Sequence, residues 1–199
     1  MRALLLVVLS VSLAGCATLR PVTAQDSSTS ANDSVFALQH WPAWQAVGRI
    51  AVKSGGSGFN ASFDWRQRGL DSELIVEGPF GAGRSRLQAS PTRIRVESGG
   101  VPALEFAPPF DGVAQALLER VGFSVPLQAL SFWLRGVPDP ELAVTPTDGG
   151  GFQQSGWVIQ PEQMQAVSVA PGALPRKVTL TQGAARIRVI VDRWAGGGS

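Results

Sequence analysis

Hydrophobic and polar residues alternate along most of the chain after position 35. The clearest run covers residues 59–66, where Phe59, Ala61, Phe63 and Trp65 alternate with polar neighbours. Successive side chains of a β-strand point to opposite faces. A period of two with one polar face therefore predicts an antiparallel sheet that is exposed to solvent on one side. The same alternation recurs at residues 93–97, 177–181 and 186–192.

Short glycine-containing segments separate the alternating runs. Residues 54–58, with the sequence SGGSG, lie between two such runs and predict a hairpin loop. Residues 68–71 and 182–184 predict two further turns. The pattern therefore favours strands that follow one another through tight connections.

Two stretches in the middle of the chain depart from the alternation. Residues 111–121 predict a helix, with Asp111 as its N-cap and apolar side chains on one face. Residues 124–135 predict a second helix, with Ser124 as its N-cap and Gly136 directly after its end.

A third and weaker helix is predicted over residues 35–45, where Pro42 interrupts it. The sheet thus dominates, and the helices come mostly from one block of the chain. A strongly curved antiparallel sheet with helices filling its concave side accounts for both observations. The expected fold class is therefore mainly β, within the α+β architectures.

The N-terminal residues have the pattern of a bacterial lipoprotein signal. Arg2 precedes a short apolar run, and Leu13 and the small residues Ala14 and Gly15 precede Cys16, the only cysteine. We predict that residues 1–15 are removed and that Cys16 carries the lipid. An ordinary secretory signal that happens to contain a cysteine is the alternative. Ala17, where an Asp would favour the inner membrane, favours the outer membrane of a Gram-negative bacterium.

The remaining chain divides into a tether, one domain and a tail. Residues 16–33 are small and polar and predict a flexible tether behind the acylated cysteine. Residues 34–195 are expected to form the domain, and residues 196–199 a flexible tail. The formal net charge of +2 falls to +1 when Arg2 is removed, so composition gives no case for nucleic acid.

The sequence lacks the residue sets of common enzymes. His40 is the only histidine, and no G-x-S-x-G motif accompanies it. One histidine and one lipidated cysteine cannot form a common zinc site. We therefore expect no catalytic residues, no metal and no cofactor.

Five short segments, in their order and spacing, resemble the LolB family of outer-membrane lipoproteins over roughly residues 35–195. They read WQAVGRIAV at 44–52, FDWRQ at 63–67, GPFG at 78–81, LQALSFWLRGVP at 127–138 and VDRW at 191–194. The chain departs from the family at Phe80, where the family has a smaller aliphatic residue, and in having no tyrosine.

The resemblance implies an unclosed, strongly curved antiparallel β-barrel with a lid of about three helices over an apolar cavity. Members of the family bind the acyl chains of lipoproteins that the soluble periplasmic carrier LolA hands over, and insert these lipoproteins into the outer membrane. The implied partners are a LolA-like carrier, the acyl chains of the cargo and the inner leaflet of the outer membrane. We expect the protein to face the periplasm as a monomer.

By the same resemblance, the loop at residues 77–83 is expected to enter the membrane, with Pro79, Phe80 and Gly81 at its tip. Burying a side chain such as Phe80 contributes roughly 1.5–3 kcal/mol, which can orient the protein but is too weak to anchor it. In the alternative, Phe80 folds back onto the core of an ordinary hairpin.

The acyl-chain cavity is expected to be lined by side chains from the alternating strands and the second mid-chain helix. These candidates are Ile50, Val52, Phe63, Trp65, Leu74, Val76, Ile94, Val96, Leu130 and Trp133. Ordinary core packing is the alternative for each, because aromatic and branched side chains are common in sheets.

Several arginines fall mostly on the polar faces of the predicted strands, namely Arg49, Arg84, Arg86, Arg93 and Arg95. A solvated face is the default interpretation. Docking to an acidic carrier or to lipid phosphates is the alternative, and would give a salt-dependent association rate.

The expected function is therefore that of an outer-membrane-anchored receptor that accepts lipoproteins and inserts them without covalent chemistry. A structural or partner-binding envelope lipoprotein with a filled core is the alternative, and a lipid-modifying enzyme is a third. An empty cavity inside the curved sheet would distinguish the lipoprotein receptor from the lipoprotein with a filled core.

Overall fold

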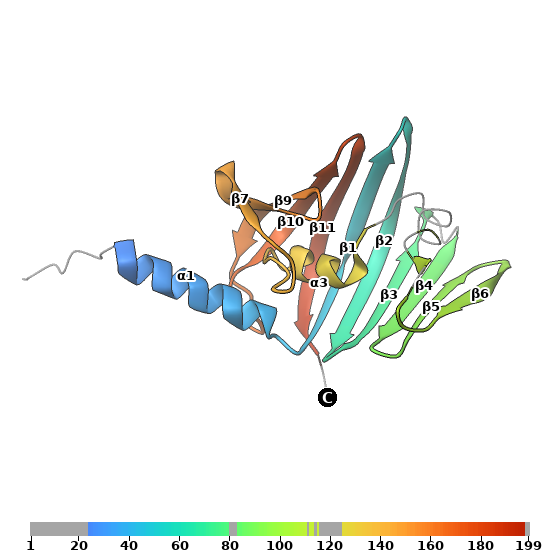
Figure 1. The fold of residues 1–199 in the computed structure, drawn as a ribbon, viewed down its shortest axis with the longest axis horizontal. Helices are drawn as coiled ribbons and strands as arrows, with labels where there is room; N and C mark the ends of the chain where they lie inside the picture. The colour runs from blue at the N-terminus through green and yellow to red at the C-terminus, as the bar shows by residue number, and fades with distance from the viewer. Residues whose placement is uncertain (1–23, 80–82, 111, 114, 116–124, 198–199) are drawn as a thin grey trace, which may run out of the picture.

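The computed structural model describes residues 24–79, 83–110, 112–113, 115 and 125–197. Its strands form a single sheet of eleven in the order β6-β5-β4-β3-β2-β1-β11-β10-β9-β8-β7. Each neighbouring pair is antiparallel. The two edge strands of the described sheet, β6 and β7, are not paired with each other, so the expected curved and unclosed antiparallel sheet is confirmed (Figure 1).

The strands follow one another along the chain, and among the described residues a helix, α3, separates the sixth from the seventh. Their bounds are β1 (Ala43–Ser54), β2 (Ser57–Arg68), β3 (Asp71–Glu77), β4 (Arg84–Ser90), β5 (Arg93–Ser98), β6 (Val101–Phe106), β7 (Thr145–Thr147), β8 (Gly151–Gln154), β9 (Trp157–Gln165), β10 (Leu174–Gln182) and β11 (Ala185–Gly196). A short 3₁₀ turn, η2 (Asp148–Gly150), joins β7 to β8.

The predicted alternation sets the two faces of the sheet. In β2, Ala61, Phe63 and Trp65 are buried, whereas the residues between them are exposed or half-buried. The predicted hairpins β1–β2, β2–β3 and β10–β11 are all present. The apolar face turns inward, and the polar face forms the convex outside.

A bulge between Val47 and Gly48 interrupts the register of β1 with β11. A Cβ atom on Gly48 would lie 2.1 Å from the carbonyl oxygen of Ile190 and 2.9 Å from the ring of Phe63. Only glycine fits such a close approach, and bulges bend the strand that carries them. Gly48 therefore allows both the curvature of β1 and the inward position of Phe63.

The helix α3 (Leu127–Leu134) lies on the concave side of the sheet and packs against β9 and β10 (Figure 1). Gly136 adopts a positive φ of 77° directly after the helix. The amide of Gly136 donates to the Trp133 carbonyl (3.0 Å), and the amide of Val137 donates to the Phe132 carbonyl (3.2 Å). These two bonds form a Schellman motif, which confirms the predicted end of this helix.

The helix α1 (Ala24–Gln39) corrects the prediction for residues 35–45. The helix ends before Pro42, and residues 43–45 begin β1, because proline supplies no amide for a helical hydrogen bond. The helix starts ten residues before the predicted domain boundary at 34, inside the segment expected to be a tether. Figure 1 shows α1 running away from the sheet instead of across its concave face.

Other sequence predictions lie partly outside the described residues. The signal peptide at 1–15 and Cys16 lie outside them, as does most of the helix predicted at 111–121. The described residues therefore contain two α-helices, where three were expected. At the other end β11 continues to Gly196, and the Gly197 amide donates to the Ala43 carbonyl (3.0 Å), so the sheet extends slightly past the predicted boundary at 195.

No helix among the described residues combines the length and hydropathy that a membrane crossing requires.

Candidate functional site

Two adjoining apolar hollows lie between α3 and the concave face of strands β1 to β5. Their volumes are about 80 Å³ and about 40 Å³. Both are bordered by Ile50 of β1, Leu74 and Val76 of β3, and Leu130 of α3. The helix thus forms one wall and the sheet the other.

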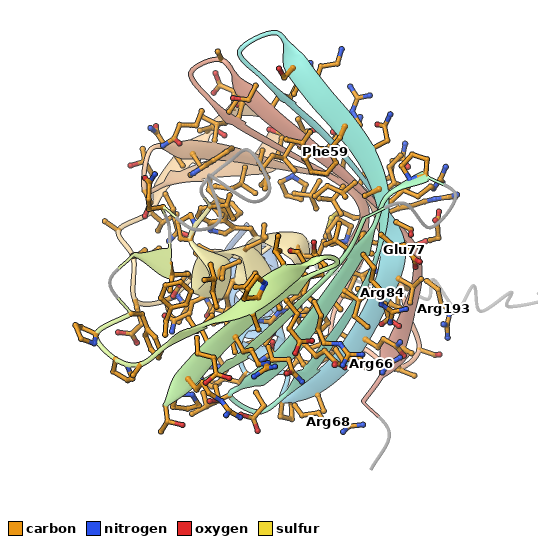
Figure 2. The ribbon with its side chains drawn as sticks, turned by 90° about the vertical axis from the view of Figure 1, so that its right-hand side faces the viewer. Phe59, Arg66, Arg68, Glu77, Arg84 and Arg193 are labelled. Atoms are coloured by element: carbon orange, nitrogen blue, oxygen red, sulfur yellow. The ribbon has the colours of Figure 1, made fainter. Side chains whose placement is uncertain are left out.

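The rest of the lining is also almost entirely apolar. The larger hollow adds Phe59, Ser85, Arg86, Leu87, Val96, Val125 and Leu127. The smaller hollow adds Phe63, Trp65, Leu134, Ile187 and Val189. Figure 2 shows Phe59 on the inner side of the curved sheet, near the end of the β1–β2 hairpin.

Seven of the ten cavity residues predicted from sequence border these hollows, namely Ile50, Phe63, Trp65, Leu74, Val76, Val96 and Leu130. The other three do not border them. Val52 and Ile94 are buried in the packed core, and Trp133 is fully buried on another face of α3. Phe59 was missed as a lining residue, although its alternation with Phe63 already placed it on the inner face.

The hollows are too small for a fatty acyl chain as they stand. An apolar cavity of roughly 150 Å³ accommodates one benzene molecule, which has six carbons. The larger hollow has about half that volume. An acyl chain therefore requires α3 to move away from β1 and β3.

The side of α3 away from the hollows is fixed by a buried glutamine. Gln154 of β8 is 1% exposed, and its Oε1 accepts hydrogen bonds from Trp133 Nε1 (2.8 Å) and the Asp139 amide (2.9 Å). Its Nε2 donates to the carbonyls of Asp139 (2.9 Å) and Leu142 (3.0 Å). All hydrogen-bonding atoms of this buried side chain are used, which fixes α3 and the segment after it to β8.

A buried arginine joins α3 to α1. Arg135 is 3% exposed and lies 5.5 Å from the ring centre of Trp44 and 4.8 Å from that of Phe132. Its Nε donates to the Ser131 carbonyl (3.1 Å), and its Nη1 donates to the Leu38 carbonyl at the end of α1. Burial lowers the pKa of Arg135 to about 10, so the guanidinium is still charged at neutral pH.

The convex face carries several ion pairs across neighbouring strands. Arg49 donates to both carboxylate oxygens of Asp192, at 3.1 and 2.8 Å. These hydrogen bonds and the adjacent charge lower the pKa of Asp192. Glu162 accepts from Lys177 Nζ (2.9 Å) and Thr179 Oγ1 (3.1 Å), and the bond from Lys177 is the main cause of its lowered pKa.

These ion pairs predict a loss of stability in acid. A carboxyl whose pKa is lower in the folded state stabilises the fold above its unfolded pKa, near 4, and this contribution is lost as the pH falls through the folded pKa. We expect the melting temperature of Glu162→Gln to fall less than that of the wild type between pH 5 and pH 3. Thermal unfolding followed by circular dichroism measures this. Glu141→Gln is the control, because Glu141 has no ion pair among the described residues. If both variants reduced the decrease in melting temperature between pH 5 and pH 3 equally, the effect would not come from the ion pair of Glu162.

The loop expected to enter the membrane is described only at its ends. Gly78 and Pro79 follow β3, and Pro79 is exposed. Phe80 and Gly81 lie outside the described residues. The position of the loop, between β3 and β4, is as the sequence predicts.

No group of three or more His, Cys, Asp or Glu side chains among the described residues is arranged to hold a metal. His40 is exposed, and its ring lies 4.0 Å from that of Phe36.

The sequence matches the family described as "Outer membrane lipoprotein LolB" over residues 42–194. Proteins named "Outer-membrane lipoprotein LolB" are similar over most of their length. The one from Chromohalobacter salexigens is 31% identical, covering 94% of this chain and 87% of its own. The one from Nitrosococcus oceani is 30% identical, covering 92% of both. A solved LolA superfamily protein from Nitrosomonas europaea shares the fold, with a TM-score of 0.51 and 8% identity over 90% of this chain and 95% of its own.

Proposed function

Because the chain belongs to the LolB family of outer-membrane lipoproteins, we propose that the space between α3 and the sheet receives the acyl chains of lipoproteins bound for that membrane. The protein acts in lipoprotein localisation, as a receptor and insertion protein at the outer membrane of a Gram-negative bacterium. Its role is non-catalytic.

The observation that carries the acyl-chain proposal is the pair of apolar hollows under one face of α3. Leu127, Leu130 and Leu134 line the hollows, whereas Trp133 on another face is held by Gln154. Movement of the leucine face away from Leu74 and its neighbours would enlarge the space without breaking the polar contacts on the other side. Entry of acyl chains then replaces water around apolar side chains, which provides the affinity.

In this proposal the lid consists of α3 and the helix predicted at residues 111–121, and α1 lies outside it. Val113 supports this, because it is buried and packs against Leu87, Ile94 and Val96 beside the larger hollow. The small volume of the hollows favours the alternative of a lipoprotein with a filled core that binds a protein partner. That alternative predicts no binding of acyl chains.

Transfer runs downhill in this proposal, from a LolA-type carrier to this monomeric receptor and then to the bilayer. Each tenfold gain in affinity corresponds to about 1.4 kcal/mol, so modest differences suffice. The test mixes a carrier loaded with a triacylated lipoprotein with the acylated chain in vesicles, and measures how the lipoprotein distributes. If the lipoprotein stayed on the carrier at equilibrium, the proposal would be contradicted. It would also be contradicted if the receptor carried no bound lipoprotein after incubation with cargo.

We expect Phe80→Glu to accept cargo from the carrier but deliver at least about tenfold less of it to the bilayer. A carboxylate at the loop tip replaces a side chain whose burial contributes roughly 1.5–3 kcal/mol and adds a charge that opposes insertion. Leu70→Glu is the matched control, because Leu70 is an exposed apolar residue in the β2–β3 turn. Flotation of vesicles measures delivery, and normal delivery by Phe80→Glu would remove the loop from the mechanism.

A further inference from the structure

The convex face of the sheet has an excess of positive charge. Thirteen basic residues lie in its strands, namely Arg49, Lys53, Arg66, Arg68, Arg84, Arg86, Arg93, Arg95, Arg176, Lys177, Arg186, Arg188 and Arg193. Eight acidic residues accompany them, namely Asp64, Asp71, Glu73, Glu77, Glu97, Glu105, Glu162 and Asp192. None of the twenty-one is buried. Figure 2 shows Arg66, Arg84 and Arg193 on this outer side, opposite Phe59.

Ion pairs leave this excess uncompensated. Within the described residues, six of the eight acidic side chains form ion pairs, and only Asp71 and Glu77 do not. Eight of the basic side chains, Arg188 and Arg84 among them, have no ion-pair partner there. The face is therefore suited to a surface that carries phosphate groups.

A hollow of about 730 Å³ opens on this face at the foot of the loop that follows β3. It exists because β3 pairs with β2 only as far as the Glu77–Ser62 pair, after which the chain leaves the sheet at Gly78. The hollow is open to solvent, and its polar side chains are Arg49, Arg188, Asn60, Ser62 and Glu77.

The polar groups of this hollow match a phosphodiester. Arg49 uses Nε and Nη2 for Asp192, which leaves Nη1, and Arg188 has no ion pair among the described residues. Guanidinium groups bind phosphate oxygens through charge-assisted hydrogen bonds, and the Asn60 amide can add a neutral one. The Ser62 hydroxyl already donates to the Glu77 carbonyl (3.3 Å).

Glu77 on the opposite rim makes the match more specific. It has no ion pair within the described part of the chain and lies two strands away from Arg49, which is about 10 Å at the backbone and less between long side chains. A carboxylate at this place disfavours a small multiply charged anion and suits an ammonium group a few bonds away from the phosphate.

We propose that this hollow binds the headgroup of an ethanolamine phospholipid, with the phosphodiester at Arg49 and Arg188 and the ammonium at Glu77. The inference rests on the proposed function, since a headgroup bound beside Pro79 would place the adjoining loop at the membrane. Headgroup binding would add a lipid-selective contact to the membrane affinity that the apolar loop at residues 77–83 provides. An acidic protein surface is the competing occupant and is an outcome of the test.

Native mass spectrometry of the acylated full chain in detergent tests this proposal, with phosphatidylethanolamine, phosphatidylglycerol and phosphatidylcholine as probes. Every protein in this experiment also carries Val76→Glu, which removes the binding of lipid chains to the apolar cavity between α3 and the sheet. We expect phosphatidylethanolamine to be retained best, and the double variant Arg49→Gln/Arg188→Gln to lower its retention about tenfold. Glu77→Gln should abolish the preference over phosphatidylglycerol.

The matched control is Arg68→Gln/Arg93→Gln, which removes the same charge at the other end of the strands. Equal losses in both double variants would mean attraction to charge alone and would overturn the proposal. So would an unchanged lipid profile, or a loss of carrier binding without a loss of lipid. The proposed function fails separately, if the wild type does not take cargo from the carrier.

Discussion

Val76→Glu is expected to abolish the binding of acyl chains while the sheet still folds. Val76 is half-buried and borders both hollows, facing Leu130 of α3. An ionised carboxylate there would lose its hydration when a hydrocarbon chain enters, which costs several kcal/mol. We therefore expect the affinity for a fluorescent fatty-acid analogue to fall by about a hundredfold or more. Fluorescence titration of the acylated chain in detergent-free nanodiscs measures it.

The neighbouring residue provides the control. Ile75 lies on the same strand and points to the convex face, where it pairs with Asp64 and Arg86 on the adjacent strands. Ile75→Glu introduces the same carboxylate into the same strand outside the cavity and should leave the affinity within about twofold. Equal affinities of the two variants would show that acyl chains do not bind between α3 and the sheet, and the filled-core alternative would then stand.

Gln154→Leu is expected to destabilise the protein by about 3–5 kcal/mol. Leucine has a similar volume but leaves Trp133 Nε1 and the Asp139 amide without acceptors, and the carbonyls of Asp139 and Leu142 without a donor. Each buried group without a partner costs about 1–3 kcal/mol, with some of the loss relieved by relaxation of the segment after α3. Urea unfolding of the wild type and the variant measures the difference.

Gln153→Leu is the control for this loss. Gln153 is the preceding residue of β8 and is exposed, so its substitution should change the free energy of unfolding by less than about 0.5 kcal/mol. If Gln154→Leu unfolds like Gln153→Leu, the amide does not hold α3 against β8. The fluorescent fatty-acid analogue provides a second measurement. A loosened α3 should let the analogue enter faster, so we expect a higher association rate in Gln154→Leu.

The alternation of apolar and polar residues was sufficient to predict the faces of the sheet. Phe63 and Trp65 are inward because strand side chains alternate, and no tertiary information is needed for that. The curvature depends on Gly48, whose requirement for glycine arises from a carbonyl of β11, about 140 residues later. Such a long-range contact has no local signature in the sequence.

The site could be predicted only in part, for a related reason. The helix α3 is apolar over much of its circumference, so periodicity cannot tell whether Trp133 or Leu130 faces the hollows. Gln154 did offer a signal, since it is a polar residue at an inward position of β8, two residues after Phe152. Buried amides of this kind are usually fully hydrogen-bonded, so an inward glutamine indicates a specific polar partner. The volume of the hollows depends on how side chains pack, which a single sequence does not determine.

The separate edges of β6 and β7 have a mechanical consequence. In a closed barrel the strand number and stagger fix the circumference, and a wider interior requires broken backbone hydrogen bonds. Here the two ends of the sheet can spread apart while each of the ten ladders between neighbouring strands stays intact. The girth of the sheet is therefore adjustable, and under the proposed function one scaffold would accommodate cargo with different numbers of hydrocarbon tails and narrow again after their release.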